Sequence, residues 1–101
     1  MQAHTRQVYL GLGTNLGNKR ANLNQAIQHI EKDAGRLLRA SSVYETAPGG
    51  LTEQPGFLNQ VVLLETALPP VTLLTVLLDI ETRMGRRRLR KWGSRLIDID
   101  I

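Results

Sequence analysis

The chain has no cysteine among its 101 residues and only four aromatic side chains, Tyr9, Tyr44, Phe57 and Trp92. The lack of cysteine excludes disulfides, thiolate catalysis and zinc–cysteine sites. No apolar run approaches the roughly 20 residues that span a membrane. Residues 1–7 also lack the apolar core of a signal peptide. We therefore expect a soluble, cytoplasmic protein.

The positive charge of the chain is concentrated in one stretch. The formal net charge is +4, yet residues 83–95 hold seven basic and no acidic residues, while the rest holds six basic and nine acidic ones. Such a pattern favours a focused anion site over a broad nucleic-acid or membrane surface. A solvated charged loop is the alternative. The length predicts one domain over residues 1–101, built on a single core.

Apolar spacing and turn residues predict four strands and two helices in the order β-α-β-β-α-β. The predicted strands cover residues 8–13, 36–46, 57–67 and 95–101. One helix follows Asn18, a good N-cap, and ends at Gly35; the other follows Pro69 and ends at Gly85. The uninterrupted apolar run at 61–64 predicts a strand that is buried on both faces.

This element order is that of the ferredoxin-like α+β fold, an antiparallel sheet with two helices on one face. In that fold the first and third strands are central, and the fourth is an edge strand beside the first. We expect a monomer, with self-association through this exposed edge as the alternative.

The last predicted strand carries two carboxylates, Asp98 and Asp100, alternating with Ile97, Ile99 and Ile101. Alternation places the acids on one face, about 7 Å apart along the strand. Like charges this close repel one another, and Mg²⁺ is a natural neutraliser. Acids that merely protect an edge strand are the alternative. With the cationic stretch, the pair indicates a site for a metal-bound polyphosphate, usually Mg-ATP.

The glycines at 11, 13 and 17 do not form a phosphate loop, because the Gly-Lys-Ser/Thr ending is absent. They are better suited to a tight turn and to the close approach of a flat ligand to the backbone. Trp92 could stack on a ring or anchor its loop to the core.

Four segments together resemble the 6-hydroxymethyl-7,8-dihydropterin pyrophosphokinases, early enzymes of folate biosynthesis. They are residues 11–17, 41–48, 54–59 and 81–101. The resemblance implies an elaborated ferredoxin-like fold. It also implies transfer of the terminal pyrophosphoryl group of ATP to the hydroxymethyl oxygen of the dihydropterin, with release of AMP.

The resemblance also implies roles for individual residues. Asp98 and Asp100 would hold two Mg²⁺ ions, and with Arg86 and Arg95 they form the expected catalytic set. The residues expected to bind the nucleotide are Glu81, Arg88, Lys91, Trp92 and Arg95. On the pterin side, Phe57 would stack on the ring, Asn59 would read its polar edge, and Thr46 would contribute backbone contacts.

The chain departs from the family pattern in a few places. Lys91 stands where arginine is usual, Ser94 where proline is usual, and Gly49 where a larger apolar residue is expected. The family also continues past the acid pair, into a His-Pro segment and an Arg-x-Phe segment that add nucleotide contacts and a second pterin-stacking aromatic. Two alternatives therefore stay open: a truncated, weakly active or inactive core of the enzyme, and a ferredoxin-like RNA-binding module. Small-molecule substrates, rather than nucleic acid or membrane, are the expected partners.

Overall fold

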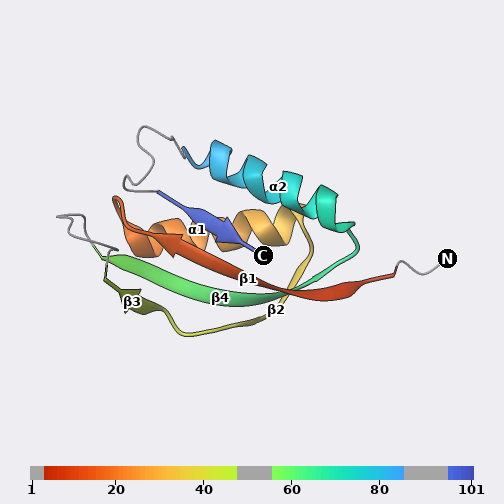
Figure 1. Cartoon of the computed structure of the whole chain (residues 1–101), viewed down its shortest axis with the longest axis horizontal. Helices are drawn as coiled ribbons and strands as arrows, with labels where there is room; N and C mark the ends of the chain where they lie inside the picture. The colour runs from red at the N-terminus through yellow and green to blue at the C-terminus, as the bar shows by residue number, and fades with distance from the viewer. Residues whose placement is uncertain (1–3, 48–55, 86–95) are drawn as a thin grey trace.

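The computed structural model describes residues 4–47, 56–85 and 96–101. Both helices lie on the same side of an antiparallel sheet (Figure 1). This α+β arrangement confirms the predicted fold class. The elements are β1 (Arg6–Thr14), α1 (Lys19–Asp33), β2 (Arg36–Ala40), β3 (Tyr44–Thr46), β4 (Phe57–Thr66), α2 (Pro70–Arg83) and β5 (Asp98–Asp100).

The strands of the sheet lie in the order β2-β4-β1-β5, with β3 pairing to β4 beyond the end of β2. β1 and β4 form the long central pair, in register from Arg6–Thr66 to Thr14–Leu58. β5 pairs with β1 alone. The predicted central and edge positions of these strands are therefore confirmed.

The predicted second strand, residues 36–46, is in fact two short strands. A register shift between Leu37 and Arg39 bends β2. Ser41 then bonds to Val61 through both its backbone N–H and its hydroxyl, and β3 begins three residues later. The Ser41 hydroxyl thus takes the place of a backbone acceptor for Val61 on the adjacent strand β4, and the regular strand ladder is interrupted here. The observed β5 is also shorter than the predicted strand at residues 95–101, since it covers only Asp98–Asp100.

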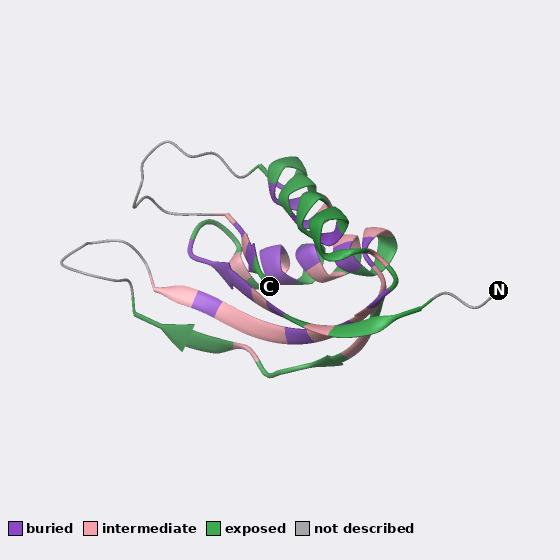
Figure 2. Cartoon of the chain, turned by 45° about the vertical axis from the view of Figure 1, so that its right-hand side comes forward, coloured by how far each residue is buried: buried purple, intermediate pink, exposed green. Residues whose placement is uncertain are grey.

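The core lies between the sheet and the helices, where one face of every long strand is buried (Figure 2). From the strands it takes Leu10, Leu12, Val62, Leu64 and Ile99, from the segment just before β5 Ile97, and from the helices Leu23, Ala26, Ile30, Leu73, Leu77 and Ile80. The opposite face of the sheet is not covered by either helix. Val61 and Leu63 point to that face and are only half-buried. The prediction that the run at 61–64 is buried on both faces is therefore wrong.

The ends of the helices follow the sequence signals. The side chain of Asn18 accepts the amide hydrogen of Ala21, 3.1 Å away, so Asn18 is the predicted N-cap of α1. Past the end of α1, a Cβ atom on Gly35 would lie 2.2 Å from the carbonyl oxygen of Glu65, so only glycine fits there. In the described part of the chain, neither helix is both long and apolar enough to cross a membrane.

Candidate active site

The uncovered face of the sheet carries a row of four residues in register across four strands. Tyr44 on β3 is opposite Asn59 on β4, Asn59 is opposite Gly13 on β1, and Gly13 is opposite Asp98 on β5. Neighbouring strands are about 4.8 Å apart, so Asn59 and Asp98 face one another across roughly 10 Å. The glycine between them contributes no side chain of its own to this interval, which the side chains of Asn59 and Phe57 border.

The next row on the same face places Gly11 between Val61 on β4 and Asp100 on β5. Ile99, the residue between the two acids, is buried on the helix side, whereas Asp98 is half-buried and Asp100 is exposed. Both carboxylates of the acid pair, Asp98 and Asp100, therefore point to the uncovered face, each beside a glycine of β1. The predicted separation of acids and isoleucines between the two faces is confirmed.

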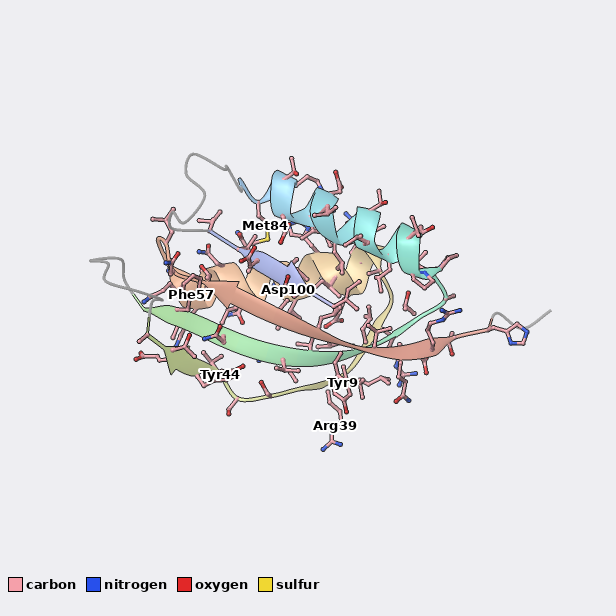
Figure 3. All side chains as sticks on the ribbon, viewed as in Figure 1. Tyr9, Arg39, Tyr44, Phe57, Met84 and Asp100 are labelled. Atoms are coloured by element: carbon pink, nitrogen blue, oxygen red, sulfur yellow. The ribbon has the colours of Figure 1, made fainter. Side chains whose placement is uncertain are left out.

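A pocket of about 170 Å³ joins these two rows. Its walls come from four strands, and Figure 3 labels three of its residues, Tyr44, Phe57 and Asp100. The pocket brings together four of the predicted site residues, the acid pair with Phe57 and Asn59. Its lining is Gly11, Leu12, Gly13, Tyr44, Phe57, Asn59, Asp98 and Asp100.

Hydrogen bonds fix the side chain of Asn59 at the pocket wall. Its Nδ2 donates to the Thr46 hydroxyl at 2.9 Å and to the Tyr44 carbonyl oxygen at 3.4 Å. Its Oδ1 faces the glycine floor, 3.4 Å from where a Cβ atom of Gly13 would lie. Asn59 therefore presents an acceptor to the pocket while Thr46, a predicted pterin residue, holds its amide from behind.

Sequence reasoning did not assign Tyr44 to the site. It reaches the pocket because β3 pairs with β4 in the register that sets Tyr44 opposite Asn59. The alternation Tyr44-Glu45-Thr46 places the tyrosine and the threonine on one face. Register between strands that are distant in sequence is not readable from one chain, so no available signal could have paired Tyr44 with Asn59.

Glu81 lies on the other side of β5 from the pocket. Its side chain is buried, with 4% of its surface exposed, and its Oε2 accepts the Ile99 amide hydrogen at 2.7 Å. Because that amide donates to α2, it points away from β1, toward the free edge of the sheet. Glu81 thus accepts the outward-pointing N–H group of the edge strand, which could otherwise pair with a strand of a second chain.

The turn that follows β1 is held from within by Asn22. Its Nδ2 donates to the Thr14 hydroxyl at 3.1 Å and to the Leu16 carbonyl oxygen at 2.8 Å. Thr14, Asn15 and Asn22 are all buried. This polar cluster fixes the end of β1, and with it Gly13 on the pocket floor.

Five predicted site residues, Arg86, Arg88, Lys91, Trp92 and Arg95, lie outside the described residues, and so do Gly49 and Ser94. The described residues on either side of positions 86–95 are nonetheless close together. A Cβ atom on Gly85 would lie 3.6 Å from the side chain of Leu96, which precedes β5. Gly85 and Leu96 therefore lie near the end of β5 that carries Asp98.

Among residues 4–47, 56–85 and 96–101, no third carboxylate or imidazole joins the acid pair in a metal-binding group. A permanent structural metal normally has more protein ligands. Mg²⁺, in contrast, is commonly held by one or two carboxylates together with waters and substrate phosphates. The pair therefore fits an ion that arrives with a polyphosphate.

Residues 9–101 match the family model for 7,8-dihydro-6-hydroxymethylpterin-pyrophosphokinase (HPPK). The chain belongs to this family. The resemblance found in the sequence is thereby confirmed, and the match favours it over an RNA-binding module.

Relatives named as 2-amino-4-hydroxy-6-hydroxymethyldihydropteridine pyrophosphokinase support the assignment. The Methylorubrum extorquens protein is 47% identical over 94% of this chain and 61% of its own length. The Bacillus subtilis protein is 39% identical over 92% of this chain and 56% of its own length. The Pseudomonas putida protein is 41% identical over 96% of this chain and 81% of its own length. The chain thus spans about three-fifths of the first of these HPPK relatives.

Solved structures show the same fold. A crystal structure of Plasmodium falciparum HPPK-DHPS superposes with a TM-score of 0.74, at 20% identity over 96% of this chain and 27% of that one. The wild-type form with pteroate gives the same TM-score at 17% identity. At such low identity the likeness concerns the fold alone, and it agrees with the observed HPPK-like sheet and helices.

Proposed function

We propose that this protein transfers a pyrophosphoryl group from Mg-ATP to the hydroxymethyl oxygen of 6-hydroxymethyl-7,8-dihydropterin and releases AMP. One observation carries the proposal: a single pocket holds the acid pair at one side and Phe57 with Asn59 at the other. Such a reaction needs a metal–phosphate site and a site for a flat, polar-edged ring within reach of one another.

The acid pair serves the phosphate side. Asp98 and Asp100 would hold Mg²⁺, with two ions expected, and the metal would neutralise charge on the transferring group and align the attacking hydroxyl. Gly85 and Leu96, which flank residues 86–95, lie close together, and Leu96 is two residues before Asp98. This suits Arg86, Arg88, Lys91 and Arg95 as phosphate ligands, because guanidinium groups match phosphate oxygens. Arg86 and Arg95 are the two that we assign to catalysis.

The glycine floor and the β4 wall serve the pterin side. The ring of Phe57 lies 3.7 Å from the Cβ position of Gly13, so it borders the floor and can stack on a flat heterocycle. The Oδ1 of Asn59 can accept from an amino or ring N–H group of the pterin. A ring without that donor would leave a partly buried acceptor unpaired, which is the basis of selectivity.

The outer face of α2 supports a nucleotide role for the Glu81 region. Leu74, Leu78 and Glu81 recur at i, i+4 and i+7 and so share one face of the helix, the face that reaches the free edge of β5. Leu74 and Leu78 are exposed, and so is Ile101 beyond the end of β5. We propose that the adenosine of ATP lies along this apolar face, with Trp92 contributing from the cationic stretch.

An inactive or weakly active core is the alternative, and the family match favours the enzyme over it. The expected cytoplasmic location, monomeric state and single-domain organisation stay predictions. AMP release from Mg-ATP with the dihydropterin tests the main proposal. The Asp98→Asn variant should abolish AMP release, whereas Asp79→Asn, at an exposed acid on α2, should retain it. AMP release that is unchanged in Asp98→Asn would overturn the proposal. No AMP release from the folded wild-type chain would favour the inactive core.

A further inference from the structure

The described glycines have different structural reasons for lacking a side chain. At Gly35 a Cβ atom would clash with the backbone of β4, and at Gly17 and Gly85 the φ angles of 70° and 92° favour glycine. At Gly13 a Cβ atom would make ordinary to tight contacts with Asn59 and Phe57. Gly11 has none of these reasons, because a Cβ atom there would meet no atom within 4 Å.

Gly11 is also costly where it stands. It lies inside the central strand β1, paired on both sides, and it is not among the described glycines with positive φ. Glycine in a strand interior loses more backbone entropy than other residues and contributes no side-chain packing. Strand stability alone would therefore favour alanine or valine at this position.

The space beside Gly11 belongs to the candidate site. Gly11 lines the pocket, and its strand neighbours are Val61 on one side and the metal-side carboxylate Asp100 on the other. A side chain at position 11 would project into the pocket between them, one row along from the Asn59–Gly13–Asp98 row. With the ring over Gly13 beside Phe57 and Asn59, as in the proposed function, a group that extends from the ring toward the acid pair would reach the space beside Gly11.

We propose that Gly11 is a specificity-determining residue of this site: its missing side chain makes room for the ring-borne hydroxymethyl group between Val61 and Asp100. The inference rests on the proposed function, since it concerns that ligand. It predicts opposite effects of one substitution. A side chain at position 11 stabilises the strand and weakens binding of the pterin.

The test compares the wild-type chain with Gly11→Ala and Gly11→Val. Binding of 6-hydroxymethyl-7,8-dihydropterin is measured by calorimetry with Mg²⁺ and a non-hydrolysable ATP analogue, and Tm is measured by circular dichroism. The alanine variant should have a Tm raised by roughly 2–8 °C. The valine variant should bind the pterin at least about tenfold more weakly, because a single added methylene in a pocket costs 10-fold or more.

Gln7→Val is the matched control, because Gln7 lies on the same strand and the same face but outside the pocket. It should leave pterin affinity unchanged. Wild-type binding that persists at full strength in Gly11→Val would overturn the Gly11 inference and leave the proposed function standing. A large fall in Tm in both Gly11 variants would also overturn it, since the glycine would then be structural. If the folded wild-type chain binds no pterin at all, the proposed function fails and the inference fails with it.

Discussion

Glu81 on α2 accepts the amide hydrogen of Ile99, the residue between the two carboxylates of the acid pair, at 2.7 Å. This bond links the helix layer to the strand that presents Asp98 and Asp100 to the pocket. The acid pair is therefore set in place from both sides, by pairing with the glycines of β1 and by Glu81 at the free edge.

Glu81→Ala should destabilise the fold by about 1–3 kcal/mol, because the buried Ile99 N–H would lose its acceptor. The same variant should weaken Mg²⁺ binding at the acid pair, since β5 is no longer fixed at that point. Glu81→Gln retains a carbonyl oxygen that can accept this hydrogen, so it should recover most of the stability. Chemical denaturation and a Mn²⁺ titration followed by electron paramagnetic resonance would measure the two effects.

Separate outcomes distinguish the roles of Glu81. If Glu81→Gln is as stable as wild type but binds the ATP analogue more weakly, the carboxylate charge acts on the nucleotide. If both variants unfold at wild-type denaturant concentrations, the bond to Ile99 contributes nothing measurable and the positioning role is wrong.

Asn22→Asp should cost about 1–3 kcal/mol of folding free energy, although the two side chains have nearly the same shape. Asn22 donates from its amide to both Thr14 and the Leu16 carbonyl oxygen, whereas an ionised carboxylate has no hydrogen to donate. The buried carboxylate would instead face the Leu16 oxygen. Equilibrium urea unfolding measures the loss.

The control for this change is Asn24→Asp, at an exposed position on the same helix. Because its side chain is in water, the substitution should change stability by no more than about 0.5 kcal/mol. Equal losses in the two variants would mean that helix charge, and not the turn after β1, accounts for the effect of Asn22→Asp.

Gly35→Ala should be among the most damaging single changes in the chain, with a loss of roughly 2 kcal/mol or more. The added Cβ atom would lie 2.2 Å from the Glu65 carbonyl oxygen, which is held in the central sheet. The backbone of α1 or of β4 must move to relieve this contact. A thermal unfolding curve that matches the wild-type curve would contradict the clash.

Much of this architecture could be predicted because it is encoded locally. The cap at Asn18, the stop at Gly35 and the alternation around Asp98 each depend on neighbouring residues, and each has the predicted role. Tyr44 shows what local patterns leave out. It belongs to the pocket only through its pairing with Asn59, a long-range register that propensity does not specify.

The run at 61–64 illustrates a second limit. Its residues are uniformly apolar, yet only Val62 and Leu64 are fully buried, because both helices pack on one face. Composition indicates that a side chain tolerates burial and does not indicate whether another layer covers it. The positions of Phe57 and Asn59 in the pocket were likewise expected from the family resemblance, not from strand periodicity.

Lys19→Met should weaken pterin binding while changing stability little. The Lys19 ammonium donates to the Gly56 carbonyl oxygen at 3.2 Å, which ties the start of α1 to the residue just before Phe57. Gly56 is itself tightly placed, since a Cβ atom there would lie 3.0 Å from the Thr46 carbonyl oxygen. Losing the lysine would loosen the start of β4, which carries Phe57, the proposed stacking residue. Methionine keeps most of the apolar stem, so packing is largely preserved.

Arg20→Met is the appropriate comparison, because it removes a neighbouring exposed cation that has no such contact with Gly56 among the described hydrogen bonds. The Lys19 variant should bind 6-hydroxymethyl-7,8-dihydropterin several-fold more weakly than the Arg20 variant, by calorimetry at matched ionic strength. An equal loss of pterin affinity in both variants would point to a long-range electrostatic effect, which salt screens over about 10 Å at 0.1 M. A loss confined to Lys19 that persists at 0.5 M salt would identify the tether to Gly56 as the cause, because a short hydrogen bond is far less sensitive to screening.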